Sequence, residues 1–349
     1  MRCKLIAVAV AAAVASVSMS AHAATGDTTI GGKMYFDFTH INQKNSDTGT
    51  TNKTGTGTDV KRFYLSVTHD FNSIWSANLT TDFDYVPSDG QTNLFVKKAY
   101  VQGKFSNAAV LRIGSADMPW IPFVEHQYGF RYVENTITDR LHFANSADWG
   151  LHLGGKVGGN GSFTYSTAVV NGGGYKHPGR SKSVDFAGRA AFMPIEGLVI
   201  AVGGYSGKLG HDLQNSPAMQ TATRGDALVA YTSKRLRVGG EYFTAKNWNN
   251  VTSPMADKAD GYSLWASYGL TDTMTAFARY DSAKLSKNLD PAKKDTYYNA
   301  GIEFAITKGF KLAAVYKHEK GDYTSMVPMP VHTANTKTDE IGVWGEVAF

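Results

Sequence analysis

The sequence predicts an all-β fold, a transmembrane antiparallel β-barrel of about 16 strands that forms one domain. Three observations support this class. Apolar and polar residues alternate along segments of about ten residues, as in strands with one face toward lipid and the other toward a lumen. Aromatic residues gather at the ends of these segments. Short gaps between the segments alternate with long ones.

The composition excludes several other classes. Of 349 residues, 42% are hydrophobic and 12% are aromatic, so the chain is too apolar to be disordered. Its single cysteine, Cys3, cannot form a disulfide within the chain. Beyond the first 23 residues, no apolar run approaches the ~20 residues that a membrane-spanning helix requires. A glycine-rich and weakly charged chain of this kind favours β structure.

Residues 1–23 have the features of a cleaved secretory signal peptide. Arg2 and Lys4 give a positive start, an apolar stretch follows, and Ala21-His22-Ala23 fits a small-x-small cleavage site. A retained membrane anchor is the alternative, but the apolar stretch is short for one. We therefore expect export and a mature chain of residues 24–349. Its net charge would be +5 less the two leader charges, or +3.

The first strand illustrates the alternation. Met34, Phe36 and Phe38 share one face of residues 30–38, whereas Tyr35 and Asp37 share the other. The same pattern recurs to the last residue. The 16 candidate strands are residues 30–38, 61–71, 75–85, 95–105, 109–114, 149–157, 162–170, 184–192, 198–206, 226–232, 236–244, 262–270, 274–281, 297–306, 310–318 and 340–349.

The gaps between these strands distinguish a membrane barrel from a soluble β-sandwich, which shows the same alternation. Short gaps fall at residues 70–73, 158–161, 193–197 and 307–309, and long ones at residues 41–59, 207–223, 245–260 and 320–337. Tight turns at one end and long loops at the other are typical of a membrane barrel, whose closure leaves no strand edge in lipid. The soluble sandwich stays the alternative.

A signal peptide, 16 alternating segments and a last strand that ends in Phe349 resemble the trimeric porins of Gram-negative outer membranes. Residues 30–37, Ile-Gly-Gly-Lys-Met-Tyr-Phe-Asp, are similar to the opening strand of the phosphate-selective porin family. Residues 111–114 and 118–120 are similar to that family's segment before the third loop. This resemblance implies a 16-stranded barrel, a homotrimer, a third loop folded into the channel, and no cofactor. The arginine and lysine ladder that a phosphate-selective pore needs is not traceable in the sequence.

Residues 115–147 break the strand pattern and follow the fifth candidate strand, where the third long loop should fall. Pro119 and Pro122 exclude this segment from a central strand. Its charged side chains are the candidate constriction residues: Asp117, Glu125, Arg131, Glu134, Asp139 and Arg140, with His126 and His142 beside them. The resemblance implies that the loop folds inward and that its acids face a basic wall. The alternative is a loop outside the channel or at the trimer contact, with solvated charges.

Basic residues with the parity of the polar strand faces are the candidates for the opposite wall. They are Arg62, Lys98, Arg112, Arg189, Arg237 and Arg279. Each could equally form an ion pair or fill the lumen without a role in selectivity. Acids of the same faces, among them Asp82, Asp185, Glu303 and Glu346, offset many of these charges. We therefore expect at most a mild anion preference.

Signals for other chemistry are weak. His142, Asn145 and Ser146 are residue types used by hydrolases, but their spacing matches no nucleophile motif, so an outer-membrane barrel enzyme is the less favoured alternative. Histidines are scattered, and no glycine cluster leads into a helix that could hold a phosphate. Basic residues are interspersed with acids rather than forming a stripe. We predict no enzyme activity, metal, cofactor or nucleic-acid partner.

The sequence thus predicts an outer-membrane porin, a water-filled channel for the passive diffusion of ions and small hydrophilic solutes. A substrate-specific channel for phosphate, another anion or a sugar is the alternative. Tyr35, Tyr64 and Tyr100 share the polar-face parity and could form a track on which sugar rings stack. The expected partners are further copies of the chain in a homotrimer, outer-membrane lipid, and the permeating ions and solutes.

Overall fold

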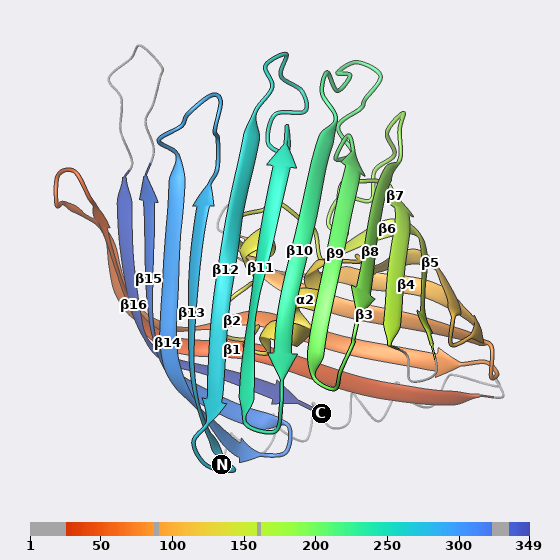
Figure 1. Ribbon diagram of the computed structural model, residues 1–349, viewed down its shortest axis with the longest axis horizontal. Helices are drawn as coiled ribbons and strands as arrows, with labels where there is room; N and C mark the ends of the chain where they lie inside the picture. Colours follow the sequence, from red (N-terminus) through yellow and green to blue (C-terminus); the bar gives the residue numbers. More distant parts are fainter. Residues whose placement is uncertain (1–25, 87–90, 159–161, 323–334) are drawn as a thin grey trace.

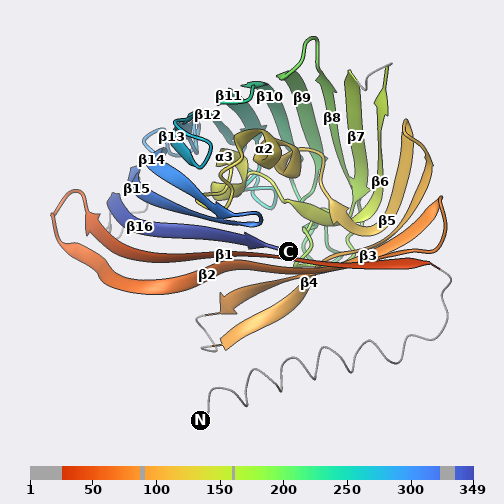
Figure 2. The same ribbon diagram turned by 90° about the horizontal axis from the view of Figure 1, so that it is seen from below.

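In the computed structural model, which describes residues 26–86, 91–158, 162–322 and 335–349, the chain forms a closed antiparallel barrel. Each of the 16 strands pairs with its neighbours in the sequence, and the last strand, β16 (Thr336–Ala348), pairs with the first, β1 (Asp27–Asn45) (Figures 1 and 2). The predicted 16-stranded barrel is confirmed. The predicted leader, residues 1–23, lies outside the described residues.

The other strands follow one another around the barrel. They are β2 (Thr51–Asp70), β3 (Trp75–Val86), β4 (Gln91–Ser106), β5 (Ala109–Asp117), β6 (Ala147–Val157), β7 (Phe163–Val170), β8 (Asp185–Phe192), β9 (Leu198–Gly207), β10 (Ala222–Thr232), β11 (Leu236–Lys246), β12 (Lys258–Gly269), β13 (Met274–Lys284), β14 (Lys294–Thr307) and β15 (Phe310–Asp322). Two helices, α2 (Ile121–Tyr128) and α3 (Ile137–Arg140), lie between β5 and β6. No helix of the described residues has the length and apolar character needed to cross a bilayer.

The seam between β1 and β16 closes the barrel with a continuous antiparallel register along Lys33 to Asn45. Next to it, the Gly32 N–H donates to the carbonyl oxygen of Phe349 (N···O 3.0 Å), and the Phe349 N–H donates back to Gly32 (3.1 Å). The Phe349 ring covers Gly32 so closely that a Cβ at this position would lie 2.1 Å from the ring Cζ. The absence of a side chain at position 32 therefore lets the end of the seam close.

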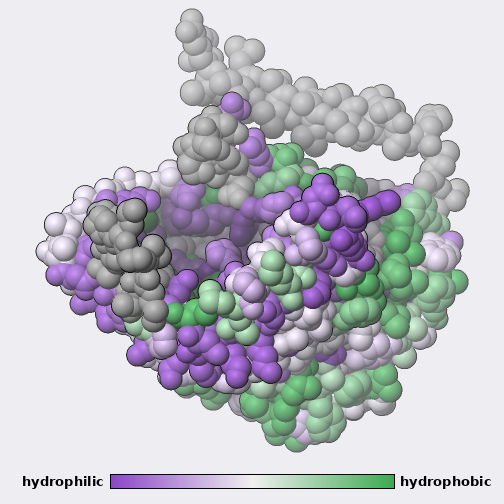
Figure 3. Space-filling model, turned by 90° about the horizontal axis from the view of Figure 1, so that it is seen from above, coloured by the Kyte–Doolittle hydropathy of each residue, from purple (hydrophilic) through white to green (hydrophobic). Residues whose placement is uncertain are grey.

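The outer surface carries exposed aromatic residues at two levels. Near the tight turns these residues are Phe71, Trp75, Phe105, Phe163, Phe192, Tyr268, Phe304 and Phe349. Near the long loops they are Phe38, Phe186, Tyr242, Tyr262, Tyr280, Tyr298 and Tyr316. Exposed aliphatic residues such as Leu79, Ile113 and Leu264 lie between the two levels. Aromatic bands that flank an apolar belt match the two interfaces and the core of a bilayer. Figure 3 shows hydrophilic residues around the mouth at the long-loop end and hydrophobic residues over parts of the outside.

The inward strand faces are polar, as predicted, but β-bulges break the strict alternation, and two of them place lysines in the lumen. One of the two register shifts of β1 against β2 leaves Lys61 without a partner in β1, and the register of β3 against β4 shifts likewise at Lys97. A bulge turns an additional side chain toward a face where alternation would not place it. Lys61 accordingly lies 3.2 Å from an oxygen of Asp37, and Lys97 donates to the hydroxyl of Tyr64 (3.1 Å).

The prediction of a long gap at residues 41–59 is wrong. β1 and β2 continue through most of this region as one hairpin, as far as Asn45 and Thr51. Residues 51–60 are exposed on both faces, so neither face requires apolar side chains, and the alternation disappears while the backbone pairing persists. The long gaps predicted at residues 207–223 and 245–260 are loops.

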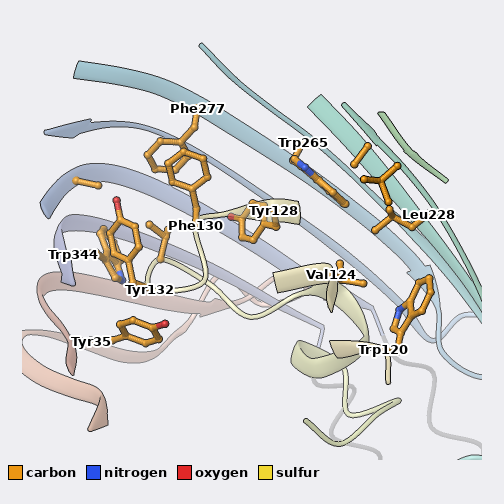
Figure 4. Packing of buried hydrophobic residues seen from close by; sticks show 14 of the residues in the cluster. Tyr35, Trp120, Val124, Tyr128, Phe130, Tyr132, Leu228, Trp265, Phe277 and Trp344 are labelled. Atoms are coloured by element: carbon orange, nitrogen blue, oxygen red, sulfur yellow. The ribbon is translucent and has the colours of Figure 1, made fainter. Parts of the chain in front are cut away.

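One side of the barrel interior is filled. Residues 118–146, called the inner loop from here on, include α2 and α3 and lie inside the ring of strands (Figure 2). Their apolar side chains form two buried clusters with residues of the surrounding barrel, and Figure 4 shows the one around α2. The channel is therefore confined to the space between the inner loop and the remaining wall.

Candidate functional site

The local sequence of the inner loop explains where α2 begins and ends. Pro122 lies in the first turn, where a helix tolerates a residue without an N–H donor. Gly129 ends the helix with φ 83°, and its N–H donates to the carbonyl oxygen of Glu125 (2.9 Å). Glycine adopts this left-handed conformation without the strain that a Cβ would introduce.

Aromatic residues dock the inner loop on the wall. The ring of Phe130 stacks on Phe277 with centroids 4.2 Å apart, and Tyr128 meets Trp265 at 5.9 Å (Figure 4). Trp120 is 2% exposed, and its indole N–H donates to a carboxylate oxygen of the wall. The predicted inward folding of the third loop is therefore confirmed.

Four arginines of the barrel wall hold the backbone of the inner loop. Their guanidinium groups donate to carbonyl oxygens: Arg189 to Pro119 (3.0 Å), Arg224 to Phe143 (2.6 Å), Arg237 to His126 (3.0 Å) and Arg279 to Asn135 (2.6 Å). A guanidinium group has five N–H donors, so it can hold a loop carbonyl and still contact a second group. The sequence placed Arg189, Arg237 and Arg279 on the wall, but periodicity could not reveal that they also position the loop.

Between the inner loop and the wall formed by β13, β14 and β15, the charges of loop and wall are paired. Arg140 lies 3.3 Å from Asp281, 2.5 Å from Asp295 and 2.7 Å from Glu319. Arg279 contacts the same Asp281 at 2.6 Å. The side chains of Arg140 and Arg279 are 8% and 1% exposed, and carboxylates contact both guanidinium groups, so their charges are offset at close range. The acids on β13, β14 and β15 account for this, because they draw both guanidinium groups onto the wall.

Glu134 lies at the edge of this paired region. Its carboxylate oxygen is 3.3 Å from the ammonium nitrogen of Lys317 on β15. Burial raises the pKa of Glu134, but the charges of Lys317 and Arg140 outweigh this effect and lower the pKa from 4.5 to about 2. Glu134 therefore stays ionised at any pH at which the barrel would ordinarily be studied.

The open face of the inner loop carries Arg131 between two carboxylates. Its guanidinium group lies 2.5 Å from Glu125 and 3.4 Å from Asp139. Burial lowers the pKa of Arg131, but these two carboxylates outweigh it and raise the pKa above its usual value. The guanidinium carbon is 6.0 Å from the ring centroid of Tyr35 on β1, so the loop approaches the opposite wall here.

The wall that faces Arg131 is basic. Arg62 lies 3.8 Å from the buried Asp82, and Lys98 lies 2.6 Å from Asp117 at the end of β5. Lys97 is 8% exposed and contacts the Tyr64 hydroxyl, and no carboxylate of the described residues lies within 4.0 Å of its ammonium group.

Two cavities separate the open face of the loop from this wall. One has a volume of about 260 Å³ and is lined by Lys61, Arg62 and Arg131 among others. The second has a volume of about 460 Å³, with Lys97 and Lys98 on one side and Glu125 on the other. Acids and bases thus face one another across the gap, with Arg62 and Lys98 on the predicted side of it.

Lys97 was not among the predicted wall residues, because strict alternation places it on the lipid face. The signal that could have revealed it is the pair Lys97-Lys98 itself, since one of two adjacent lysines in a regular strand must face lipid. A bulge removes that cost by turning both side chains toward water.

The remaining predicted residues lie away from this gap. Arg112 lies on the tight-turn side of the inner loop, where its Nε donates to Gln102 (2.8 Å) and its guanidinium carbon lies 5.3 Å from the ring centroid of Tyr100. The rings of Tyr35 and Tyr64 meet edge to face at 89°. These three tyrosines do not present parallel faces in a row.

The segment with the hydrolase-type residues makes structural contacts. The indole N–H of Trp248 donates to the carbonyl oxygen of His142 (2.8 Å). The N–H of Met118 donates to the carbonyl oxygen of Ser146 (3.0 Å). Both contacts use the backbone of the segment to hold the inner loop to itself and to the loop between β11 and β12.

A closed barrel with an apolar outer belt, a polar lumen and an inner loop that narrows the lumen defines a membrane channel. A family model of Gram-negative porins matches residues 7–326, and the chain therefore belongs to the Gram-negative porin family. It is a multi-pass β-barrel of the outer membrane that forms a porin channel.

Solved structures share this fold at low sequence identity. The anion-selective porin from Comamonas acidovorans has a TM-score of 0.64 and 14% identity, covering 93% of this chain and 100% of that chain. The outer membrane channel DcaP of Acinetobacter baumannii has a TM-score of 0.64 and 10% identity, with 93% and 97% covered. The trimer form of in-vitro folded OmpT from Vibrio cholerae has a TM-score of 0.57 and 13% identity, with 93% and 99% covered. A comparison with curated protein sequences found no match.

Proposed function

We propose that this porin prefers anions and that the basic wall and the inner loop together set its selectivity. The observation that carries the proposal is the uneven pairing of charges in the lumen. Eight cations of the described residues line cavities and have no carboxylate within 4.0 Å: Lys97, Lys104, Arg112, Lys156, Arg189, Lys234, Arg235 and Arg237. Unpaired charge of one sign along a channel raises the local concentration of ions of the opposite sign.

Unpaired acids offset only a small part of this charge. Asp272 lines the same cavity as Arg237, is exposed and has no cation within 4.0 Å in the described part of the chain. Asp148, Asp185 and Glu241 are likewise unpaired, but they are 1%, 0% and 3% exposed. Asp185 is held instead by the Tyr205 hydroxyl and by the N–H groups of two loop residues. These three buried carboxylates therefore support the wall and do not face the ions that pass.

The residues of the narrow gap have separate roles in this proposal. Arg62, Lys97 and Lys98 attract anions from one side, while Glu125 and Asp139 form the opposing acidic side. Asp117 lies on the basic side, where it pairs with Lys98. Arg131 stands between the two sides. Glu134, Arg140 and Arg279 position the inner loop, and Arg112 and Arg189 contribute to the field on the tight-turn side. Transport is passive, and we assign no enzyme activity to the chain.

Reversal potentials in a planar bilayer test the anion preference. With the purified protein in a KCl gradient, the reversal potential should lie toward that of chloride. The variant Lys97→Gln should move it toward zero, because this lysine lines the gap and has no carboxylate of the described residues within 4.0 Å. Arg180→Gln removes an equal charge from the exposed residue of a long loop and serves as the matched control. A wild-type reversal potential on the potassium side would refute the proposal.

We also propose that the chain assembles as a homotrimer after cleavage of a signal peptide behind Ala23. The shared fold with a barrel whose structure is a trimer form supports the assembly, and the small-x-small pattern supports the cleavage site. Sedimentation of the detergent-solubilised protein should give three times the mass of the mature chain, and N-terminal sequencing should begin at Ala24. A monomer mass, or an intact leader in the outer membrane, would contradict the respective proposal.

A further inference from the structure

A large cavity lies on the tight-turn side of the inner loop. Its volume is about 990 Å³, and it is enclosed by α2 on one side and by the wall from β4 to β9 on the other. Four of its lining residues are permanent cations: Lys104, Arg112, Lys156 and Arg189. Its one lining carboxylate is Asp117, which Lys98 contacts at 2.6 Å. The cavity thus combines a strong positive charge with room for a small molecule.

The register of the strands brings these four cations together. Lys104 pairs with Val110 on β5, two residues from Arg112, and Val110 pairs in turn with Gly154, two residues from Lys156. Arg189 on β8 comes near Lys156 because its guanidinium group donates to Thr164 (3.1 Å), the partner of Lys156 on β7. Residues far apart in the sequence therefore line one patch of the wall.

Each of the two arginines is held in place and still has unused donors. Arg112 uses its Nε for Gln102. Arg189 uses its Nε for Pro119 and one terminal nitrogen for Thr164, and its guanidinium carbon lies 3.9 Å from the ring centroid of Phe123. No carboxylate of the described residues lies within 4.0 Å of either group. A fixed guanidinium with free N–H groups is preorganised for a carboxylate or a phosphate, because less side-chain freedom is lost on binding.

We propose that this cavity is a binding site for small oxyanions that carry two or more negative charges, with either phosphate or carboxylate groups. The proposal rests on the anion preference proposed above and deepens it. The four cations, which no carboxylate of the described residues contacts within 4.0 Å, attract a multivalent anion more strongly than a chloride ion, since the electrostatic energy scales with the product of the charges. Gly154, Gly155 and Ser166 line the same wall of the cavity.

Block of the channel current by added anions tests this site. Tripolyphosphate and succinate are the two probes, added separately to single channels in a constant KCl background. The variant Arg112→Gln/Lys156→Gln removes one arginine and one lysine from the cavity. The control Arg180→Gln/Lys182→Gln removes the same two charges from an exposed long loop at the other end of the barrel.

For at least one probe, we expect the half-blocking concentration to rise roughly tenfold or more in the cavity variant and to stay unchanged in the control, because each lost charge contact weakens binding. Block by tripolyphosphate alone would show that the site binds phosphate groups, and block by succinate alone would show that it binds carboxylates. Equal half-blocking concentrations in both variants, or no block by either probe, would overturn the site. The reversal potential in KCl distinguishes the two proposals. If the wild type prefers chloride but the cavity variant is blocked as strongly as the wild type, the anion preference stands and the oxyanion site is refuted.

Discussion

Basic residues lie in two regions of the lumen, against β13–β15 and along the wall from β4 to β8, and only in the first region do carboxylates surround them. In that first region, Arg140 and Arg279 are buried against carboxylates of β13, β14 and β15. On the other wall, Arg112 and Lys156 line an open cavity and no carboxylate of the described residues lies within 4.0 Å of them. The comparison teaches that the partner of a lumen charge, and not its position on an inward strand face, decides whether it supports the fold or acts on passing ions.

The two regions also differ in how much stability the barrel would lose if a charge were removed. A buried pair has already lost its hydration, so removal of one partner leaves the other without water or counter-charge. An exposed, unpaired cation keeps its water and can be removed at little cost to stability. The same substitution should therefore have unequal effects on the two walls, which the following variants exploit.

Arg140→Met should produce the largest loss of stability. The substitution keeps most of the aliphatic volume but leaves Asp295 and Glu319 without the guanidinium that both contact. We expect the free energy of unfolding to fall by about 3–5 kcal/mol. Urea unfolding in detergent, followed by tryptophan fluorescence, measures it. Lys104→Met on the open wall is the control and should change stability by less than about 0.5 kcal/mol. Equal losses in both variants would contradict the comparison.

The stabilisation from Glu134 should depend on pH in the acid range. Its pKa is lowered from 4.5 to about 2, so its contribution is complete above about pH 5 and disappears as the pH falls toward 2. Glu134→Gln should therefore be less stable than the wild type by up to about 3 kcal/mol near pH 6. Unfolding midpoints at pH 6, 4 and 2.5 should show the difference shrinking at the lowest pH. A difference that stays constant would mean that the pairing with Lys317 is not its cause.

Gly129→Ala should weaken the docking of the inner loop by a smaller amount. Position 129 has φ 83°, and a Cβ there would lie 2.1 Å from a terminal nitrogen of Arg237. Backbone strain and displacement of this guanidinium should together cost about 1–3 kcal/mol. Gly57→Ala in β2, where a Cβ would meet nothing within 4 Å, is the matched control. Unfolding midpoints of the two variants that coincide would show that the loop tolerates the change.

Arg112→Glu should affect stability least and selectivity clearly. Because Arg112 has no acidic partner in the described residues, its loss should cost about 1 kcal/mol or less, mainly from the hydrogen bond to Gln102. The reversal potential in a KCl gradient should move toward that of potassium. Lys182→Glu, which introduces the same change of charge on a long loop, provides the control. An unchanged reversal potential would remove Arg112 from the residues that influence ion passage.

Much of the fold could be predicted from the sequence because lipid selects apolar side chains at every second position. Met34, Phe36 and Phe38 illustrate this selection, and the same rule located all 16 strands. It failed at residues 51–60, where water on both faces removes the selection. It also failed at Lys97, where a bulge shifts the parity by one residue. Backbone pairing leaves no trace in the sequence when neither face is buried.

The candidate site was predictable only in part. Pro119 and Pro122 and the broken alternation located the inner loop, and its charges followed from the sequence. The sequence could not show that Arg140 turns back toward β13–β15, because this depends on acids more than 140 residues further along the chain. Contacts such as that of Arg279 with the Asn135 carbonyl were also beyond reach, since every residue carries a carbonyl group and the acceptor has no sequence signature.

The seam between β1 and β16 limits how the channel can be altered. Because neighbouring strands are antiparallel and their number is 16, the chain returns to the end of the barrel at which it started, so Gly32 can meet Phe349. A barrel with one strand more or fewer would bring its last strand parallel to β1, and the existing pairing along Lys33 to Asn45 could not form. The diameter of this channel can therefore be widened or narrowed by redesign only in steps of one whole hairpin.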